Sequence, residues 1–171
     1  HAVMLKARAV LAIAEAFWHP VLWIDADARV RGALDAFARL PDLNVDVGIR
    51  RFQPDRADET RGAWASGTVW FGATLAGRRL IADWAYFSVL AARGGGAYGD
   101  VDGDQDVLGF LLLDRVRRRQ IRCADLTPDL AWMDHDLRLN PGSRPTIEHL
   151  QASRRRHYGP PRGGRRCSAL A

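Results

Sequence analysis

The chain has 171 residues, of which 47% are apolar and 26% charged, with a formal net charge of +5. This length suits one domain with a sizeable core, and the composition excludes wholesale disorder. No apolar run reaches the roughly 18–20 residues of a membrane-spanning helix, and the first residues lack the pattern of a secretory signal. The two cysteines, Cys123 and Cys167, are far apart, which argues against a disulfide framework and favours a reducing, cytoplasmic setting.

The positive charge is concentrated at the carboxyl end. Six arginines and no acidic residue lie in 151–171, and leaving them out gives 19 basic and 20 acidic residues in 1–150, a net charge of −1. The sequence therefore predicts a near-neutral domain over 1–150 and a basic, flexible tail over 151–171.

The first half of the chain alternates helices with short apolar strands. An Ala- and Leu-rich run without Gly or Pro predicts a helix over 3–17, which His19-Pro20 ends. The unbroken apolar run 21–24 is typical of a central strand that is buried on both faces. A short helix over 32–40, a strand over 45–49 and a polar loop over 51–63 are expected next.

The second half continues this alternation. The β-branched and aromatic residues of 64–71 predict a strand, and a helix is expected over 74–92. After the glycine-rich loop 94–103, a further helix is expected over 104–119, with Asp104 as its N-cap. Strand candidates follow at 121–126 and 146–149. The pattern predicts an α/β domain with a largely parallel sheet.

Asp25-Ala26-Asp27 follows the apolar run 21–24 directly and is the sharpest candidate for chemistry. In an extended segment residues i and i+2 point the same way, so the two carboxylates are expected to converge at the edge where open α/β sheets bind ligands. Close carboxylates repel unless a cation lies between them, and hard divalent ions share oxygen ligands with phosphates. The pair therefore predicts a metal–phosphate site, with two solvated aspartates in a turn as the alternative.

Four other segments carry polar groups that suit a site. Ser66-Gly67-Thr68 offers two hydroxyls around a glycine that lets a ligand approach the backbone, or else forms a simple bulge. Asp104-Gln105-Asp106 opens a helix, and capping alone explains only the first of the three. His149 has an imidazole that could complete the coordination of a Mn²⁺-like ion, and Lys6 is the only lysine of the chain.

The order of these segments resembles that of nucleotide-diphospho-sugar glycosyltransferases of the GT-A type, which have a DxD strand and a downstream DQD helix. The resemblance covers roughly residues 3–154, and the ordered set is more specific than any one motif. It implies a GT-A-like, Rossmann-like α/β fold with a mostly parallel sheet flanked by helices. It also implies an enzyme with a nucleotide-sugar donor and an acceptor that is a sugar, a protein or a lipid-linked glycan.

The resemblance assigns a metal site to Asp25 and Asp27, which match the DxD, and to His149, which matches a late histidine ligand. The expected cofactor is Mn²⁺ or Mg²⁺, which would neutralise charge on the leaving diphosphate.

Substrate contacts are implied by the same comparison. Lys6 matches a basic residue that faces the nucleotide-sugar, and Ser66 and Gly67 match a segment that lines the donor or acceptor pocket. Arg154 stands in place of a late phosphate-binding motif, since Arg can hold a diphosphate by bidentate contacts. Three residues match the segment at the reaction centre: Asp104, Gln105 and Asp106. A general base at the first or third of these would suit inversion.

One element of the family has no counterpart. Glycosyltransferases of this fold begin with a strand that cradles the base and ribose, and none precedes Lys6. We therefore expect an N-terminally truncated domain whose first nucleotide-binding strand is missing, and poor donor binding unless an upstream segment is restored.

Two other functions stay open. A HAD-type phosphotransferase also has D-x-D after an apolar strand, with the first Asp as nucleophile, but its motif usually continues with Gly-Thr or Gly-Val where Ala28-Arg29 stands here. The arginines of 151–171 could bind nucleic acid without sequence specificity, or hold the protein at an anionic membrane surface. Specific nucleic-acid recognition is not expected, because Tyr158 is the only aromatic residue of this tail.

Overall fold

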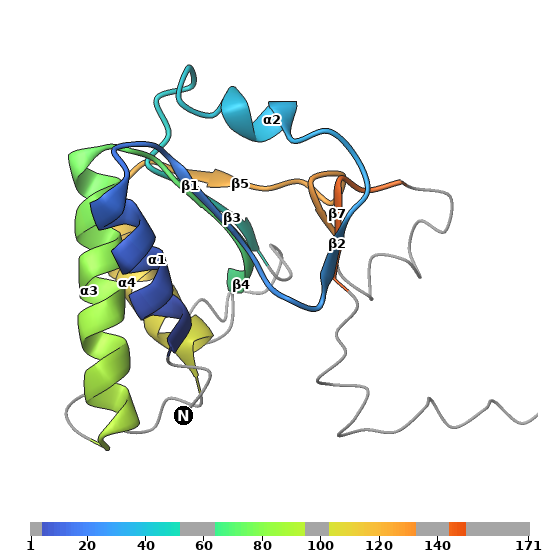
Figure 1. Cartoon of the computed structure of the whole chain (residues 1–171). Helices are drawn as coiled ribbons and strands as arrows, with labels where there is room; N and C mark the ends of the chain where they lie inside the picture. Colours follow the sequence, from blue (N-terminus) through green and yellow to red (C-terminus); the bar gives the residue numbers. More distant parts are fainter. Residues whose placement is uncertain (1–4, 52–63, 95–102, 133–143, 150–171) are drawn as a thin grey trace, which may run out of the picture.

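The computed structural model describes residues 5–51, 64–94, 103–132 and 144–149. These residues form a four-stranded sheet with three helices on one face, and a short helix and a second, three-stranded sheet beyond its other face (Figure 1). The polar loop at 51–63, the glycine-rich loop at 94–103 and the tail at 151–171 lie wholly or almost wholly outside the described residues. None of the helices in the described ranges is long and apolar enough to cross a membrane.

The larger sheet has the order β1-β4-β3-β5. Its strands are β1 (Val21–Ile24), β3 (Val47–Arg51), β4 (Trp64–Phe71) and β5 (Cys123–Asp125). The strand β4 is antiparallel to both β1 and β3, and β3 is parallel to β5, so β1, β3 and β5 run in one direction. The predicted α/β class is confirmed. The expected mostly parallel sheet is wrong, because β4 is antiparallel to both of its neighbours and, within this sheet, β3 and β5 form the one parallel pair.

The position of β1 also differs from the prediction. Among the described residues β1 is an edge strand, and three of its four residues are only half-buried. Its side chains alternate between the two faces: Val21 and Trp23 pack with the helices, whereas Leu22 and Ile24 pack on the opposite side. All four residues of β1 are apolar because the strand has an apolar cluster on each of its two faces, although it lies at the edge of the sheet.

Three helices cover one face of the larger sheet: α1 (Leu5–Ala16), α3 (Leu75–Ala92) and α4 (Asp104–Arg117). These three predicted helices are confirmed, and their ends agree with the prediction to within two residues. The N-cap of α4 is Gly103, and Asp104 is the first helical residue, so the predicted capping role of Asp104 is wrong. Its carboxylate is used elsewhere, as described below.

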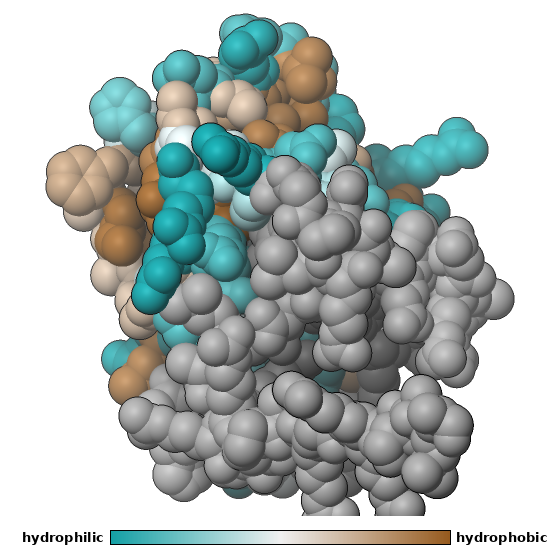
Figure 2. Space-filling view, turned by 90° about the vertical axis from the view of Figure 1, so that its right-hand side faces the viewer, coloured by the Kyte–Doolittle hydropathy of each residue, from teal (hydrophilic) through white to brown (hydrophobic). Residues whose placement is uncertain are grey.

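The opposite face packs against α2 (Asp35–Ala38) and the smaller sheet, which has the order β2-β7-β6. Its strands are β2 (Ala28–Val30), β6 (Ala131–Trp132) and β7 (Ile147–His149). The last of these was predicted, whereas β2 and β6 were not. Figure 2 views the molecule from the right-hand side of Figure 1, where hydrophobic and hydrophilic residues lie interspersed on the surface that grey residues leave visible.

Candidate functional site

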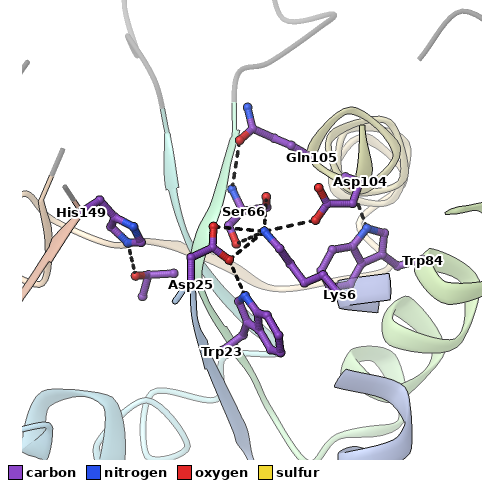
Figure 3. A network of polar contacts seen from close by, with 9 residues as sticks. Lys6, Trp23, Asp25, Ser66, Trp84, Asp104, Gln105 and His149 are labelled. Carbon is purple, nitrogen blue, oxygen red and sulfur yellow. Dashed lines mark hydrogen bonds and ion pairs between the residues drawn. The ribbon is translucent and has the colours of Figure 1, made fainter. Parts of the chain in front are cut away.

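Lys6 is the centre of a polar network between helices and strands (Figure 3). Its Nζ lies 2.9 Å from Oδ1 of Asp25 and 3.2 Å from Oδ2 of Asp104. It also donates to Oγ of Ser66 at 3.1 Å and to the Ser66 carbonyl oxygen at 3.3 Å. One ammonium group from α1 therefore joins the end of β1, the strand β4 and the start of α4.

Asp25 lies directly after β1 and is held on several sides. Its Oδ1 accepts a hydrogen bond from the indole Nε1 of Trp23 at 2.7 Å, and its backbone N–H donates to the Gly67 carbonyl oxygen at 2.8 Å. The segment that follows is a turn, closed by the Ala28 N–H donating to the Asp25 carbonyl oxygen at 3.0 Å. The premise that Asp25 and Asp27 converge because they share an extended strand is therefore wrong, and it is the turn that sets their relative positions.

Asp104 is almost fully buried at the start of α4. Burial raises the pKa of its carboxyl, and the positive charge of Lys6 opposes that shift. Although Oδ2 lies 3.2 Å from the Lys6 ammonium, it accepts no well-directed hydrogen bond from the described residues. The backbone is fixed from the other side, since the indole Nε1 of the buried Trp84 donates to the Asp104 carbonyl oxygen at 2.8 Å. The backbone of Asp104 is thus held by Trp84, whereas its Oδ2 is paired with the Lys6 charge but accepts no well-directed hydrogen bond from the described residues.

Gln105 and Ser66 link α4 to β4. The Ser66 N–H donates to Oε1 of Gln105 at 3.4 Å, a long contact. Ser66 is buried, so its hydroxyl is oriented by Lys6 and not by bulk solvent. Asp106 is half-buried in the first turn of the same helix.

His149 approaches the site from the smaller sheet. Its Nε2 lies 2.6 Å from Oγ1 of Thr68, and both side chains are buried. Burial lowers the pKa of the imidazole, and the negative charges of Asp25 and Asp27 act in the opposite direction. A buried imidazole with a lowered pKa is uncharged at neutral pH, the form that binds a metal.

The predicted residues meet in two adjacent groups. One group is centred on Lys6 and the other on His149, and the segment 25–27 lies between them. Sequence reasoning missed Trp23 and Trp84. The first could have been found, because residues two apart in a strand share a face, whereas no local pattern points to Trp84. Arg154 lies outside the described residues.

The donors fit a hard divalent cation in kind but not in spacing. Carboxylate oxygens and an imidazole nitrogen suit Mn²⁺ or Mg²⁺. Within 5–51, 64–94, 103–132 and 144–149, however, no three His, Cys, Asp or Glu side chains lie close enough together to hold one ion. A cation at Asp25, Asp27 and His149 would have to draw these ligands together or take further oxygens from a diphosphate.

Comparisons with known proteins agree with the fold. No protein-family model matches the chain, and no curated protein matches it. Among solved structures, it is similar to a glycosyltransferase involved in the glycosylation of the major capsid of PBCV-1, with a TM-score of 0.64 and 14% identity over 91% of this chain and 76% of that one. Mouse xyloside xylosyltransferase 1 in its apo form matches with a TM-score of 0.49 and 13% identity, over 88% of this chain and 63% of that one. The first match shows that the chain has a GT-A-like fold.

Proposed function

We propose that the chain is the catalytic core of a glycosyltransferase that binds a nucleotide-diphospho-sugar through a divalent cation and passes the sugar to an acceptor. The observation that carries the proposal is the Lys6 network, which gathers Asp25, Ser66 and Asp104 from three separate segments around one ammonium group. The glycosyltransferase fold supports it independently.

Lys6 has a definite part in this proposal. Its side chain is 13% exposed, and it lies between carboxylates that would otherwise repel. It therefore fixes the distance between the DxD turn and the start of α4, where the transferred sugar is expected to lie. The ammonium also offsets part of the negative charge that a diphosphate would meet beside Asp25.

Asp25, Asp27 and His149 are the residues that would hold the cation. Mn²⁺ or Mg²⁺ held there would supply electrostatic stabilisation of negative charge on a diphosphate. The indole of Trp23 donates a hydrogen bond to one carboxylate oxygen of Asp25, which orients this side chain.

Asp104 is the group best placed to accept a proton or to bind a sugar hydroxyl. Burial makes its carboxyl a better proton acceptor than an exposed aspartate, and Oδ2 has capacity for a further hydrogen bond. We propose that it accepts a hydrogen bond from a hydroxyl group of the sugar donor or of the acceptor. Gln105 and Asp106 lie beside it on the first turn of α4.

Donor hydrolysis tests the proposal without knowledge of the acceptor. The chain is incubated in Mn²⁺ with a panel of UDP- and GDP-sugars at high concentration, because the sequence predicts weak donor binding, and the released nucleoside diphosphate is measured. We expect release with at least one donor, and loss of that release in chelator and in Asp25→Asn. The exposed Asp42→Asn is the matched control and should behave as wild type.

The same assay can contradict the proposal. Release that persists unchanged in chelator and in Asp25→Asn would remove both the cation and the DxD turn from the reaction. The arginines on which nucleic-acid or membrane-surface binding depends lie outside the described residues, and no contact within those residues favours the phosphotransferase alternative.

A further inference from the structure

We propose that the end of the helix layer opposite the Lys6 network is a docking surface for an anionic membrane. This surface lies where α1 and α4 end and α3 begins, and we call it the helix-end surface. It is made of exposed apolar and basic side chains: Phe17, Trp18, Leu75, Arg79, Arg118 and Arg119. The inference goes beyond the proposed function, and its arginines are not those of the tail over 151–171.

Hydrogen bonds hold the three helix ends together. The Arg78 guanidinium, in the first turns of α3, donates to the Phe17 carbonyl oxygen at 3.1 Å, just after the end of α1. The Asp46 carbonyl oxygen accepts the N–H of Gly72, shortly before α3, at 2.9 Å. The carboxylate of the same aspartate binds the guanidinium of Arg122, shortly after α4. Figure 1 shows the end of α1 and the start of α3 together at the upper end of the helix layer.

The apolar part of the helix-end surface is exposed. Trp18 is 77% exposed, Leu75 67% and Phe17 59%. The Trp18 ring is held in place from one side, because the Arg78 guanidinium lies 3.8 Å from the ring centroid. Apolar area that is gathered and held in water is stabilised only when another molecule covers it. These side chains therefore favour a partner with an apolar layer.

The basic part gives the sign of the partner's charge. Arg79, Arg118 and Arg119 are exposed around the same helix ends. The exposed acidic side chains nearest to them in the helices that end here are Glu15 in α1 and Asp114 in α4, which pairs with Arg118. With the Arg78 charge beside Trp18, basic groups remain in excess. The surface therefore attracts an anionic partner, most strongly at low ionic strength.

A bilayer with anionic headgroups matches both parts. An indole has an apolar body and a polar N–H, and tryptophan gathers at the headgroup level of membranes. Arginine side chains reach lipid phosphates from the same depth. The apolar side chains come from the ends of two helices and not from one long helix face, so they suit shallow insertion between headgroups.

Docking by this surface leaves the candidate site free. Lys6 lies near the start of α1, and Phe17 follows its end. A rise of about 1.5 Å per residue places them about 16 Å apart along the helix axis. Asp104 opens α4, and Arg118 follows the other end of that helix. The Lys6 network would therefore face away from the bilayer, toward water-soluble substrates.

Vesicle flotation of the full chain tests the apolar part. We expect wild type to bind vesicles of equal parts phosphatidylcholine and phosphatidylserine, and the double variant Phe17→Ser/Trp18→Ser to bind at least about tenfold more weakly. Tyr86→Ser removes another aromatic side chain, 60% exposed, from a different part of α3, and it should bind as wild type. Binding by the double variant as tight as that of wild type would assign the vesicles to the tail and overturn the inference.

The same vesicles test the basic part. Arg79→Gln should weaken binding about fivefold, whereas Arg93→Gln, exposed at the other end of α3, should have little effect. Wild type should bind vesicles of phosphatidylcholine alone much more weakly. Equal effects of the two substitutions, or equal binding to both kinds of vesicle, would overturn the role of charge at this surface.

Two further measurements show what covers Trp18. Brominated lipids in the mixed vesicles should quench tryptophan fluorescence in wild type, and Trp18→Phe should stay bound but lose most of this quenching. Undiminished quenching in Trp18→Phe would overturn the inference. Sedimentation equilibrium without lipid tests a second copy as the partner. A wild-type dimer that Phe17→Ser/Trp18→Ser abolishes would assign the surface to that copy and overturn the membrane proposal.

Discussion

His149 lies directly opposite Ala28 in the antiparallel β2–β7 ladder, one residue beyond Asp27. Facing residues in such a ladder have Cα atoms about 4.5–5.5 Å apart, so the histidine is tied to the DxD turn by backbone pairing. Residues separated by more than 120 positions in sequence thus belong to one small unit. A change on either side of this unit is expected to affect the other.

Removing the Lys6 charge should destabilise the fold through Asp104. Loss of one partner of a buried ion pair typically costs about 3–5 kcal/mol, so Lys6→Met should lower the free energy of unfolding by about 3 kcal/mol in a urea titration. Adding Asp104→Asn should recover about 1 kcal/mol or more, because the buried carboxylate is then replaced by an uncharged amide. Arg8→Met, at an exposed position of the same helix, is the control. Strictly additive losses would contradict the pairing.

Acid should weaken the fold through Asp46, which is buried and bonded to the Arg122 guanidinium at 2.9 Å by each carboxylate oxygen. These hydrogen bonds lower the pKa of Asp46 from 3.8 to about 2, although burial acts in the opposite direction. The unfolded chain therefore takes up the proton first as the pH falls. The stabilisation, on the order of 2 kcal/mol, is complete above about pH 4 and is lost between about pH 4 and 2.

Urea titrations of wild type and Asp46→Asn at several pH values measure this effect. The difference in unfolding free energy should be largest at neutral pH and should shrink as the pH approaches 2. A difference that does not vary across this range would show that the carboxylate charge has no part in the stability of this region.

Two helical glycines should respond to alanine in opposite ways. A Cβ on Gly77 in α3 would lie 2.6 Å from the Gly72 carbonyl oxygen and 2.9 Å from that of Asp46, so Gly77→Ala should be destabilising. A Cβ on Gly109 in α4 would meet Trp64 at an ordinary 3.5 Å, so Gly109→Ala should stabilise by roughly 0.5–1 kcal/mol. Thermal unfolding of both variants provides the comparison. Equal changes in unfolding temperature in the two variants would contradict the close approach of Gly77 to the Gly72 carbonyl oxygen, just after β4.

Local sequence patterns predicted most of the elements that position the site. The strand over 64–71 and the helix over 74–92 follow from residue types alone, since β-branched and aromatic runs and Ala/Leu-rich runs favour different backbones. The reversed direction of β4 could not be predicted, because strand direction depends on pairing between distant segments. The three-residue strand β2 was missed for a similar reason, since its only described partner is β7.

The candidate site was predictable in its residues but not in its contacts. The order of motifs singled out Lys6, Asp25 and Asp104, and the structure brings these three together. The contact between Thr68 and His149 depends on the second sheet and has no local signal in the sequence. The same is true of the close approach of the His149 ring to Gly67. The metal roles of Asp25, Asp27 and His149 stay predictions.

Mn²⁺ titration of the purified chain, followed by electron paramagnetic resonance in the presence of UDP, is the most direct test of the central claim. The account predicts saturable Mn²⁺ binding by wild type and by Asp42→Asn, and at least tenfold weaker binding by Asp25→Asn and by Asp27→Asn. Mn²⁺ binding of wild-type strength in both of the latter variants would contradict it.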